Sequence, residues 1–435
     1  MEKFLTLNPI SSVYGDIYLP GSKSISNRVL LMSAMSNGVT CIKNLLNSDD
    51  VNHMLKVFQK IGIKFNINND YKNCIIEGCS GPLYYSNNIS LFLGNAGTVM
   101  RPLTAAFSLL NNDIILTGDS RMQERPIKDL VLALRQGGAI IKYLQNEGYP
   151  PIKIQGGFLG GKIIINGNIS SQFLTSLLIS APLAKLDTNI TLKKPLISKP
   201  YVDITMKLMK NFGITVYHEN YQKFFIKGNQ IYYSPKNIYI EGDASSASYF
   251  LAAAAIKGKS VRVIGIDKNS IQGDIQFVNI LKKMGGKINW GKNFVKCSEG
   301  RLKAIDLDAN DIPDAAMTIA ILALFTYNGK TTIIRNIYSW RLKETDRLKA
   351  MTIELKKIGA FVIEGKDYIC ITPPKKFIYA KINTYNDHRM AMCFSLIALS
   401  NQSVTIMNPK CVSKTFPQYF QEFNKISVYN SLKKF

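Results

Sequence analysis

The chain has 435 residues, of which 46% are hydrophobic and 19% are charged. This length exceeds what one ordinary hydrophobic core supports, so it predicts two domains or one domain of repeated units. The apolar runs at residues 249–256 and 315–325 are about half as long as a membrane span, which argues against an integral membrane protein. The net charge of +24 keeps nucleic-acid binding as an alternative, although only 11 of the 54 basic residues are Arg.

The residue types that mark secretion and metal binding are scarce. The first ten residues, MEKFLTLNPI, lack the basic and apolar regions of a signal peptide. Seven cysteines without a CxxC pair indicate reduced thiols in a cytosolic protein. None of the three histidines stands at metal-ligand spacing from another His or a Cys. We therefore expect a cytoplasmic protein with no metal and no cofactor.

The first motif along the chain is PGSKSISNR, residues 20–28, which leads into an apolar helical pattern. Gly permits a close backbone approach to a ligand, and the N–H groups at a helix start favour an anion. Lys23 and Arg28 add positive charge, and Ser24 adds a neutral donor. The GxxxxGK[ST] pattern is absent, so the loop does not indicate ATP. Taken alone, the motif fits a solvated basic turn equally well.

An amphipathic helix that ends in Gly and leads into a β-prone run recurs along the chain. The intervals between these glycines are 72–76 residues, and they fall at Gly62, Gly138, Gly213, Gly285 and Gly359. Gly just past a helix end adopts the left-handed conformation without strain. A sixth relative without Gly follows at residues 419–428. Six such units account for the whole chain, and this period is longer than that of common solenoids.

A second set of segments opens with small polar residues and is otherwise nearly apolar, which predicts buried helices. They lie at 22–35, 95–107, 170–183, 243–256, 313–325 and 386–399. Each unit is therefore predicted to run strand–helix–strand–helix with further strands. The result is an α/β protein of two halves with three units each, divided near Glu241.

The residues with chemical potential gather at the starts of these buried helices and in adjoining loops. In the first half they are Lys23, Ser24, Arg28, Asn95, Gly97, Thr98, Arg125, Ser170, Ser171, Gln172, Ser198 and Tyr201. In the second half they are Asp314, Lys343, Glu344, Arg347, Asn386, Asp387, His388, Arg389 and Lys414. Seven cations in this set suggest small ligands that carry phosphate and carboxylate groups. Asp314 and Glu344, which lie among cations, are the candidates for proton transfer.

Most of these residues also have a simpler interpretation when taken singly. Ser170, Asp314 and Asp387 could each be an ordinary N-cap. Lys343 and Arg347 are four residues apart and would share a solvated helix face. The segment GDASSASY is predicted to be a structural cap. The conjunction of all these residues favours a functional site.

Nine motifs resemble those of one enzyme family and occur in its order: PGSKSISNR, LGNAGTVMRP, RMQERPI, SSQF, SKPYVDIT, GDASSASYFLAAAAI, IPDAAMTIA, WRLKETDRL and YNDHRMAM. The family is EPSP synthase (3-phosphoshikimate 1-carboxyvinyltransferase), bacterial type, and the resemblance extends to about Ile426. It implies the enolpyruvyl transferase fold, an inside-out α/β barrel of two similar domains with three βαβαββ units each. Residues 21–240 would form the first domain, and residues 1–20 plus 241–435 the second, with the active site in the cleft between them.

The resemblance implies a reaction in the shikimate pathway towards chorismate. The enolpyruvyl group of phosphoenolpyruvate would pass to the 5-hydroxyl of shikimate 3-phosphate, giving EPSP and phosphate by addition and elimination. The protein would be a monomer that binds these small molecules and neither nucleic acid nor membrane. The nearest alternative is UDP-N-acetylglucosamine enolpyruvyl transferase, which uses a reactive Cys on a mobile loop, whereas residues 121–126 contain no Cys.

Matching motif positions implies a role for each site residue. Shikimate 3-phosphate would contact Lys23, Ser24, Arg28, Ser170, Ser171, Gln172, Ser198, Tyr201, Asp314, Ser339 and Lys343. Phosphoenolpyruvate would contact Lys23, Asn95, Gly97, Arg125, Gln172, Arg347, His388, Arg389 and Lys414. Asp314 is the implied base for the 5-hydroxyl, and Glu344 with Lys23 is the implied pair for the proton at C3.

The residues at four positions bear further on ligand binding. Ser339 stands where the family commonly has Asn, so one contact to the shikimate phosphate is expected to be weaker or bridged by water. Gly97, Thr98 and Pro102 match the pattern of forms that are sensitive to glyphosate, which occupies the phosphoenolpyruvate subsite.

Overall fold

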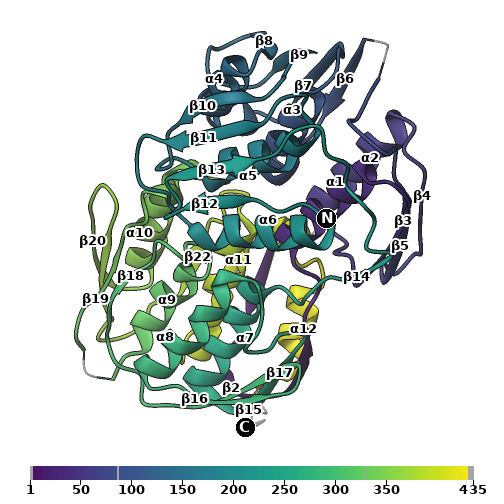
Figure 1. Cartoon of the computed structure of the whole chain (residues 1–435). Helices are drawn as coiled ribbons and strands as arrows, with labels where there is room; N and C mark the ends of the chain where they lie inside the picture. The colour runs from purple at the N-terminus through teal and green to yellow at the C-terminus, as the bar shows by residue number, and fades with distance from the viewer. Residues whose placement is uncertain (1–2, 86–87, 328, 430–435) are drawn as a thin grey trace. The chain divides into compact units, whose positions relative to one another are not determined.

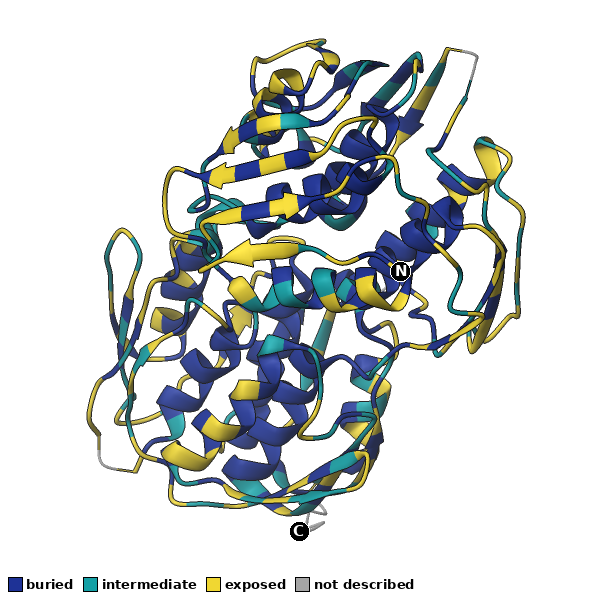
Figure 2. Ribbon diagram, in the orientation of Figure 1, coloured by how far each residue is buried: buried dark blue, intermediate teal, exposed yellow. Residues whose placement is uncertain are grey.

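The computed structural model describes residues 3–85, 88–327 and 329–429. The chain divides into two compact units: a first unit, Gly21–Ile240, and a second unit made of Met1–Pro20 with Glu241–Phe435. Both units combine helices and sheets (Figure 1), as the predicted α/β class requires. In both, the innermost helices are buried and the sheet residues alternate between buried and exposed (Figure 2).

One strand order recurs in the three sheets of the first unit. In one sheet the order is β6-β7-β9-β8, where β6 and β7 are parallel and the other pairs are antiparallel. These strands are Ile89–Phe92, Ile114–Thr117, Ile152–Gly156 and Ile140–Tyr143. The next sheet repeats this order with β10 (Gly161–Ile165), β11 (Thr188–Leu192), β13 (Lys223–Ile226) and β12 (Tyr217–Glu219).

The remaining sheet of the first unit shows how the unit closes on itself. Its order is β14-β3-β5-β4, with the strands Asn237–Tyr239, Val39–Lys43, Asn73–Glu77 and Phe65–Ile67. The position held by the first strand in the other two repeats is filled here by β14, which comes last in the unit. β14 pairs in parallel with β3, so the end of the unit completes its first repeat.

The second unit uses the same order and is completed by the N-terminal strands. One sheet is β18-β19-β21-β20, with strands Asp306–Asp308, Thr332–Arg335, Ile369–Thr372 and Phe361–Glu364. In a second sheet β2 (Ile10–Tyr18) pairs in parallel with β15 (Gly258–Ile264) and antiparallel with β24 (Ser427–Tyr429). It continues with β17 (Phe294–Ser298) and β16 (Lys287–Gly291). In the last sheet β1 (Phe4–Leu7) pairs with β23 (Val404–Met407), which also pairs with β22 (Ala380–Ile382).

The predicted buried helices form as expected and begin side by side within each unit. In the first unit they are α1 (Lys23–Met35), α3 (Gly97–Phe107) and α5 (Ser171–Ser180). In the second unit they are α7 (Ala244–Lys257), α9 (Ala316–Leu322) and α11 (His388–Ser395). Asn27 donates to Thr98 near the starts of α1 and α3, and Ser248 bonds Thr318 near the starts of α7 and α9. No helix in the described ranges is long and apolar enough to cross a bilayer.

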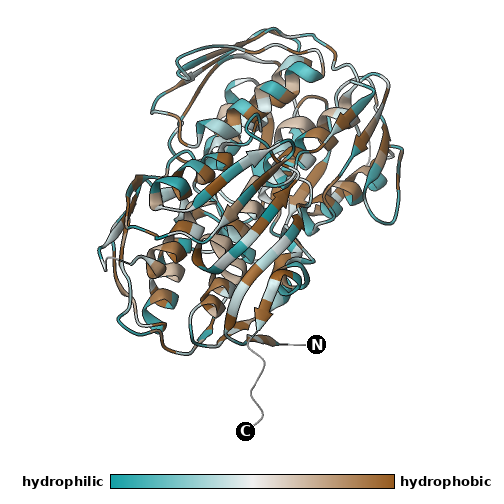
Figure 3. Ribbon diagram, turned by 90° about the horizontal axis from the view of Figure 1, so that it is seen from below, coloured by the Kyte–Doolittle hydropathy of each residue, from teal (hydrophilic) through white to brown (hydrophobic). Residues whose placement is uncertain are grey.

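The amphipathic helices also form where they were predicted. They are α2 (Asp49–Lys60), α4 (Lys128–Gln136), α6 (Lys199–Asn211), α8 (Gln276–Met284), α10 (Arg347–Lys357) and α12 (Tyr419–Ile426). The five glycines that follow the first five of these helices have φ between +81° and +111°, which confirms the left-handed helix ends. Hydrophobic and hydrophilic residues alternate along the strands (Figure 3), so each sheet buries one face.

Two of these glycines separate the cost of the backbone conformation from the cost of a steric clash. A Cβ at Gly62 (φ +81°) would meet nothing within 4 Å, whereas a Cβ at Gly285 (φ +111°) would lie 2.4 Å from the Arg301 carbonyl oxygen. We predict that Gly62→Ala lowers the free energy of unfolding by about 1 kcal/mol and that Gly285→Ala lowers it further. Urea unfolding of both variants measures this. Equal losses would contradict the clash at Gly285.

Candidate active site

The charged residues of the second unit converge on Asp314, two residues before α9. Asp314 Oδ1 accepts from Arg347 Nη1 at 2.8 Å, and Oδ2 accepts from Arg389 Nη2 at 2.9 Å. Lys343 Nζ lies 3.6 Å from Oδ1. Because α9 begins at Ala316 without a side-chain cap, the N-cap interpretation of Asp314 is wrong. The Asp314 carboxylate instead contacts three cations: Arg347, Arg389 and Lys343.

Arg347, the first residue of α10, is 1% exposed and contacts three carboxylates. Besides Asp314, it donates from Nη2 to Glu344 Oε2 at 2.8 Å and from Nε to Asp387 Oδ2 at 2.7 Å. Lys343 follows the short 3-10 helix η5 (Tyr338–Leu342) and precedes α10. The two residues therefore do not share a helix face, because the chain turns between them.

Two further residues extend this group. Lys414, at the end of the 3-10 helix η7 (Pro409–Lys414), places Nζ 3.8 Å from Glu344 Oε1. Asp387 caps α11, accepting from the backbone N–H of Arg389 at 2.9 Å, and lies 3.5 Å from His388 Nδ1. Asp387 is thus both the predicted cap and a partner of Arg347. We call this group the Asp314 cluster; its members are Asp314, Lys343, Glu344, Arg347, Asp387, His388, Arg389 and Lys414.

The electrostatics of the Asp314 cluster favour an anionic ligand. Burial alone would raise the pKa of Asp314, but the charges of Arg389, Lys343 and Arg347 hold it well below its ordinary value. Burial would likewise lower the pKa of Arg347, and its carboxylate partners raise it above the ordinary value instead. With four cations (Lys343, Arg347, Arg389 and Lys414) against three carboxylates (Asp314, Glu344 and Asp387), the cluster carries a net positive charge.

In the first unit, Lys23 opens α1 beside a carboxylate that sequence analysis did not single out. Lys23 Nζ lies 3.6 Å from Asp50 Oδ2, which also accepts from Thr98 Oγ1 at 2.8 Å. Thr98 in turn accepts from Asn27 at 3.1 Å. Asp50 belongs to an acidic first turn behind the N-cap Ser48, which is the sequence of an ordinary helix start. Nothing in the sequence distinguishes Asp50 from an acidic residue at any other helix start.

Arg125 and Asn95 meet at the start of α3. The buried Arg125 donates from Nη1 to the carbonyl oxygen of Asn95 at 3.0 Å and to its Oδ1 at 2.8 Å. A Cβ on Gly97 would lie 2.8 Å from Arg125 Nη2 and 2.4 Å from Arg101 Nη1. Gly97 therefore lets two guanidinium groups approach the first turn of α3, and a Cβ there would make both of them shift. The N–H groups of that turn add to the positive potential.

Arg28 joins three helices of the first unit. It donates to Thr205 Oγ1 (2.9 Å), Thr175 Oγ1 (3.3 Å) and the carbonyl oxygens of Ser24 (2.9 Å) and Tyr201 (3.2 Å). Burial lowers the pKa of its guanidinium to about 10, so it stays charged at neutral pH. The structure thus brings Ser24, Arg28 and Tyr201 together, where α1, α5 and α6 meet.

The remaining predicted residues lie at helix starts. Ser170 accepts from the backbone N–H of Gln172 at 3.2 Å, so its N-cap interpretation is correct, and Ser171 opens α5. Ser198 precedes α6 with φ +53° and makes no side-chain cap. Ser339 lies in η5, which is tied to the residue before Asp314 because Trp340 Nε1 donates to the Pro313 carbonyl at 2.6 Å.

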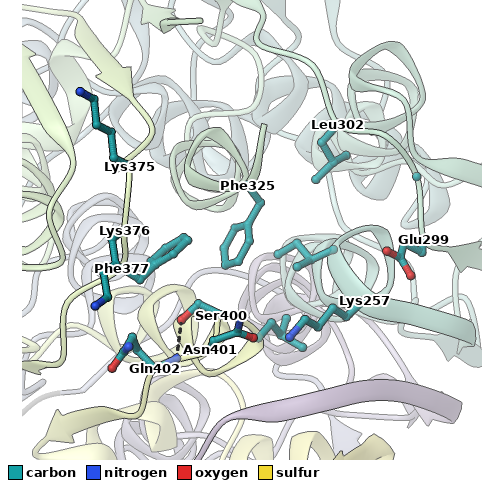
Figure 4. Close-up of a pocket in the computed structure, with 13 residues that line it drawn as sticks. Lys257, Glu299, Leu302, Phe325, Lys375, Lys376, Phe377, Ser400, Asn401 and Gln402 are labelled. Atoms are coloured by element: carbon teal, nitrogen blue, oxygen red, sulfur yellow. Dashed lines mark hydrogen bonds between the residues drawn. The ribbon is translucent and has the colours of Figure 1, made fainter. Parts of the chain in front are cut away.

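The second unit also contains a cavity of about 480 Å³, which other residues line (Figure 4). It is lined by Lys257, the last residue of α7, by Phe325 and Phe377, and by Ser400, which follows the buried segment of α11. The cavity therefore borders the C-terminal ends of helices whose N-terminal ends adjoin the Asp314 cluster. None of the predicted site residues lines it.

Comparisons with known proteins show the family of this chain. The family model described as EPSP synthase (3-phosphoshikimate 1-carboxyvinyltransferase) matches residues 7–423. A 3-phosphoshikimate 1-carboxyvinyltransferase of Buchnera aphidicola subsp. Acyrthosiphon pisum (strain Tuc7) is 62% identical over 98% of this chain and 100% of its own length. The one of Photorhabdus laumondii is 59% identical over 97% of this chain and 98% of its own length.

Solved structures also resemble this chain over nearly its whole length. EPSP synthase from Acinetobacter baumannii is 26% identical, covers 98% of both chains and has a TM-score of 0.81. The enolpyruvyl transferase NikO from Streptomyces tendae, at 13% identity and 98% coverage of both chains, has a TM-score of 0.77 and bears on the fold alone. Together these likenesses confirm the predicted fold class.

A buried carboxyl beside the cluster makes stability depend on pH. Burial, reinforced by the charge of Asp314, raises the pKa of Asp274 from 3.8 to about 6, and Asp274 accepts a hydrogen bond from Ser245 Oγ. The folded state therefore binds more protons than the unfolded state within this range, so this group's contribution to stability falls as the pH rises through it.

We predict that Asp274→Asn, which keeps an acceptor for Ser245, removes this dependence. The free energy of unfolding of the variant minus that of the wild type should rise by about 1–3 kcal/mol as the pH increases from 4 to 7. Urea unfolding across that range measures the difference. A difference that stays constant with pH would contradict the raised pKa.

Proposed function

Because the chain belongs to the EPSP synthase (3-phosphoshikimate 1-carboxyvinyltransferase) family, we propose that it transfers the enolpyruvyl group of phosphoenolpyruvate to the 5-hydroxyl of shikimate 3-phosphate. The products are EPSP and inorganic phosphate, in the shikimate pathway towards chorismate and the aromatic amino acids. The observation that carries this proposal is the Asp314 cluster, where buried carboxylates lie among cations that suit two phosphorylated carboxylates.

In this proposal each substrate has its own set of binding residues. Shikimate 3-phosphate is held by Lys23, Ser24, Arg28, Ser170, Ser171, Gln172, Ser198, Tyr201, Asp314, Ser339 and Lys343. Phosphoenolpyruvate is held by Lys23, Asn95, Gly97, Arg125, Gln172, Arg347, His388, Arg389 and Lys414. Support comes from the grouping within each unit: Arg125 with Asn95 and Gly97, and Arg347 with Arg389 around Asp314.

The addition step needs a base at the 5-hydroxyl. In the proposed mechanism the 5-hydroxyl oxygen attacks C2 of the enolpyruvyl group, and Asp314 takes the hydroxyl proton. Its low pKa ensures that the carboxylate is ionised, but a strongly held carboxylate is a weak base. Substrate phosphate and carboxylate groups that engage Arg347 and Arg389 offset the charges that depress this pKa, so substrate binding makes Asp314 more basic.

The second proton moves at C3. In the proposal Glu344 and Lys23 deliver a proton to C3 during addition and remove one during elimination, when the C2–O bond to phosphate breaks. Glu344 is 9% exposed and lies between Arg347 and Lys414, which supports a role in a site with little water. The Nζ of Lys23 beside Asp50 supports a charged ammonium at the start of α1.

We propose a cytoplasmic monomer without a cofactor that binds its two substrates and no nucleic acid. The relatives at about 60% identity are named 3-phosphoshikimate 1-carboxyvinyltransferase, which argues against the UDP-N-acetylglucosamine alternative. The absence of Cys from residues 121–126 argues the same way.

The test is phosphate release by the purified protein with Lys23→Ala beside it. We expect release that requires both phosphoenolpyruvate and shikimate 3-phosphate, and a loss of at least about 100-fold in the variant, because one charge-assisted contact is worth about 1.5–3 kcal/mol before any proton transfer is lost. Lys64→Ala is the matched control, since Lys64 is 79% exposed and pairs only with the exposed Glu77 among the residues described. Release with UDP-N-acetylglucosamine instead would refute the assigned acceptor.

The close packing of two guanidinium groups around Gly97 leads to a prediction about inhibition by glyphosate. Inhibition should be competitive with phosphoenolpyruvate, and Gly97→Ala should relieve it at least about tenfold, because the new Cβ displaces the guanidinium groups of Arg101 and Arg125. Inhibition constants of the wild type and the variant measure this. Gly81→Ala is the control, since a Cβ there meets nothing within 4 Å. Unchanged inhibition in Gly97→Ala would sink the prediction.

A further inference from the structure

The segment between β22 and α11 carries an unusual backbone conformation directly before Asp387. Tyr385 and Asn386 have φ of +53° and +55°. Two consecutive non-glycine residues in the left-handed region are unfavourable, so the surrounding contacts must hold them there. The Asn386 Oδ1 accepts from Asn408 Nδ2 at 3.2 Å, and Thr384 Oγ1 donates to the Met407 carbonyl at 2.9 Å.

The strongest of these contacts come from a buried carboxylate on α10. Glu354 is 0% exposed. Its Oε1 accepts from the Tyr385 hydroxyl at 2.7 Å, and its Oε2 accepts from the backbone N–H of Asn383 at 3.1 Å. Lys357 Nζ balances the charge with bonds of 2.8 and 2.7 Å to the two oxygens. Within the segment, Glu354 thus contacts Asn383 and Tyr385, which precede Asp387 of the cluster.

The same helix also holds the far end of this segment. Arg347 lies seven residues before Glu354, which places both on one face of α10. Arg347 Nε donates to Asp387 Oδ2 at 2.7 Å, and Asp387 Oδ1 accepts from the backbone N–H of Arg389. α10 therefore fixes the segment at residues 383, 385 and 387, and so fixes where Arg389 leaves the backbone.

We propose that Glu354 and Tyr385 are positioning residues for Arg389, an inference that rests on the proposed function. Neither residue belongs to the Asp314 cluster. By holding the left-handed turn, they set the direction from which the Arg389 guanidinium reaches Asp314 Oδ2 at 2.9 Å and Tyr249 Oη at 3.1 Å. Their loss should weaken phosphoenolpyruvate binding, because Arg389 is assigned to that substrate.

Two variants test the proposal without emptying the core. Tyr385→Phe removes one hydroxyl, and Glu354→Gln keeps the side-chain volume but replaces one acceptor oxygen with a donor amide. We expect the KM for phosphoenolpyruvate to rise about five- to twentyfold in each, with the KM for shikimate 3-phosphate and kcat within about twofold of the wild type. Tyr379→Phe is the matched control. Its hydroxyl bonds Thr405 at 3.0 Å, and it is 46% exposed against 37% for Tyr385.

Thermal unfolding separates positioning from a merely structural role. If the two residues only stabilise the fold, the variants will melt earlier but keep the wild-type KM for phosphoenolpyruvate well below their Tm, and the inference is overturned. An equal rise in both KM values would overturn it too. A wild type that releases no phosphate defeats the proposed function instead, and calorimetric titration with phosphoenolpyruvate then decides whether Tyr385→Phe weakens its binding.

Discussion

The second unit depends on one buried charge, the guanidinium of Arg347. A cation with 1% exposure is stable only if carboxylates replace the water that it has lost. Its three partners come from different places: Asp314 before α9, Glu344 before α10 and Asp387 before α11. Satisfying this one side chain therefore fixes the relative placement of three helix starts. The same ion pairs that stabilise the unit preorganise its charged site, so the two properties cannot be altered independently.

The repeated architecture explains why charges can be gathered at all. Each repeat delivers the start of a buried helix to the same end of its unit, where unpaired N–H groups and the helix dipole favour anions. Closure by β14 in the first unit, and by β1 and β2 in the second, completes the outermost repeats without adding another helix. At one of these helix starts, Gly97 leaves room for the guanidinium groups of Arg101 and Arg125.

The repeats could be predicted from the sequence because they are local patterns. A Gly after an amphipathic helix, as at Gly213, has one conformational explanation, and its period reveals the unit. Contacts between repeats are different. Asp50 has the sequence context of a helix start, and only the fold places it beside Lys23 and Thr98. The helical spacing of Lys343 and Arg347 was also misleading. Lys343 lies in the turn before α10, and contacts with Asp314 and Glu344 hold that turn.

The depressed pKa of Asp314 links binding to chemistry. Arg389 and Arg347 donate to its two oxygens, so the carboxylate is ionised but weakly basic. A phosphate or carboxylate that takes over these donors removes the charges that hold the proton affinity down. In the proposal both arginines bind phosphoenolpyruvate, so the arrival of that substrate strengthens the group assigned as base. Phosphoenolpyruvate is an enol phosphate, and the addition of a hydroxyl across its double bond needs a base at the hydroxyl oxygen. In the proposal, the substrate that is attacked therefore also strengthens the base that assists the attack.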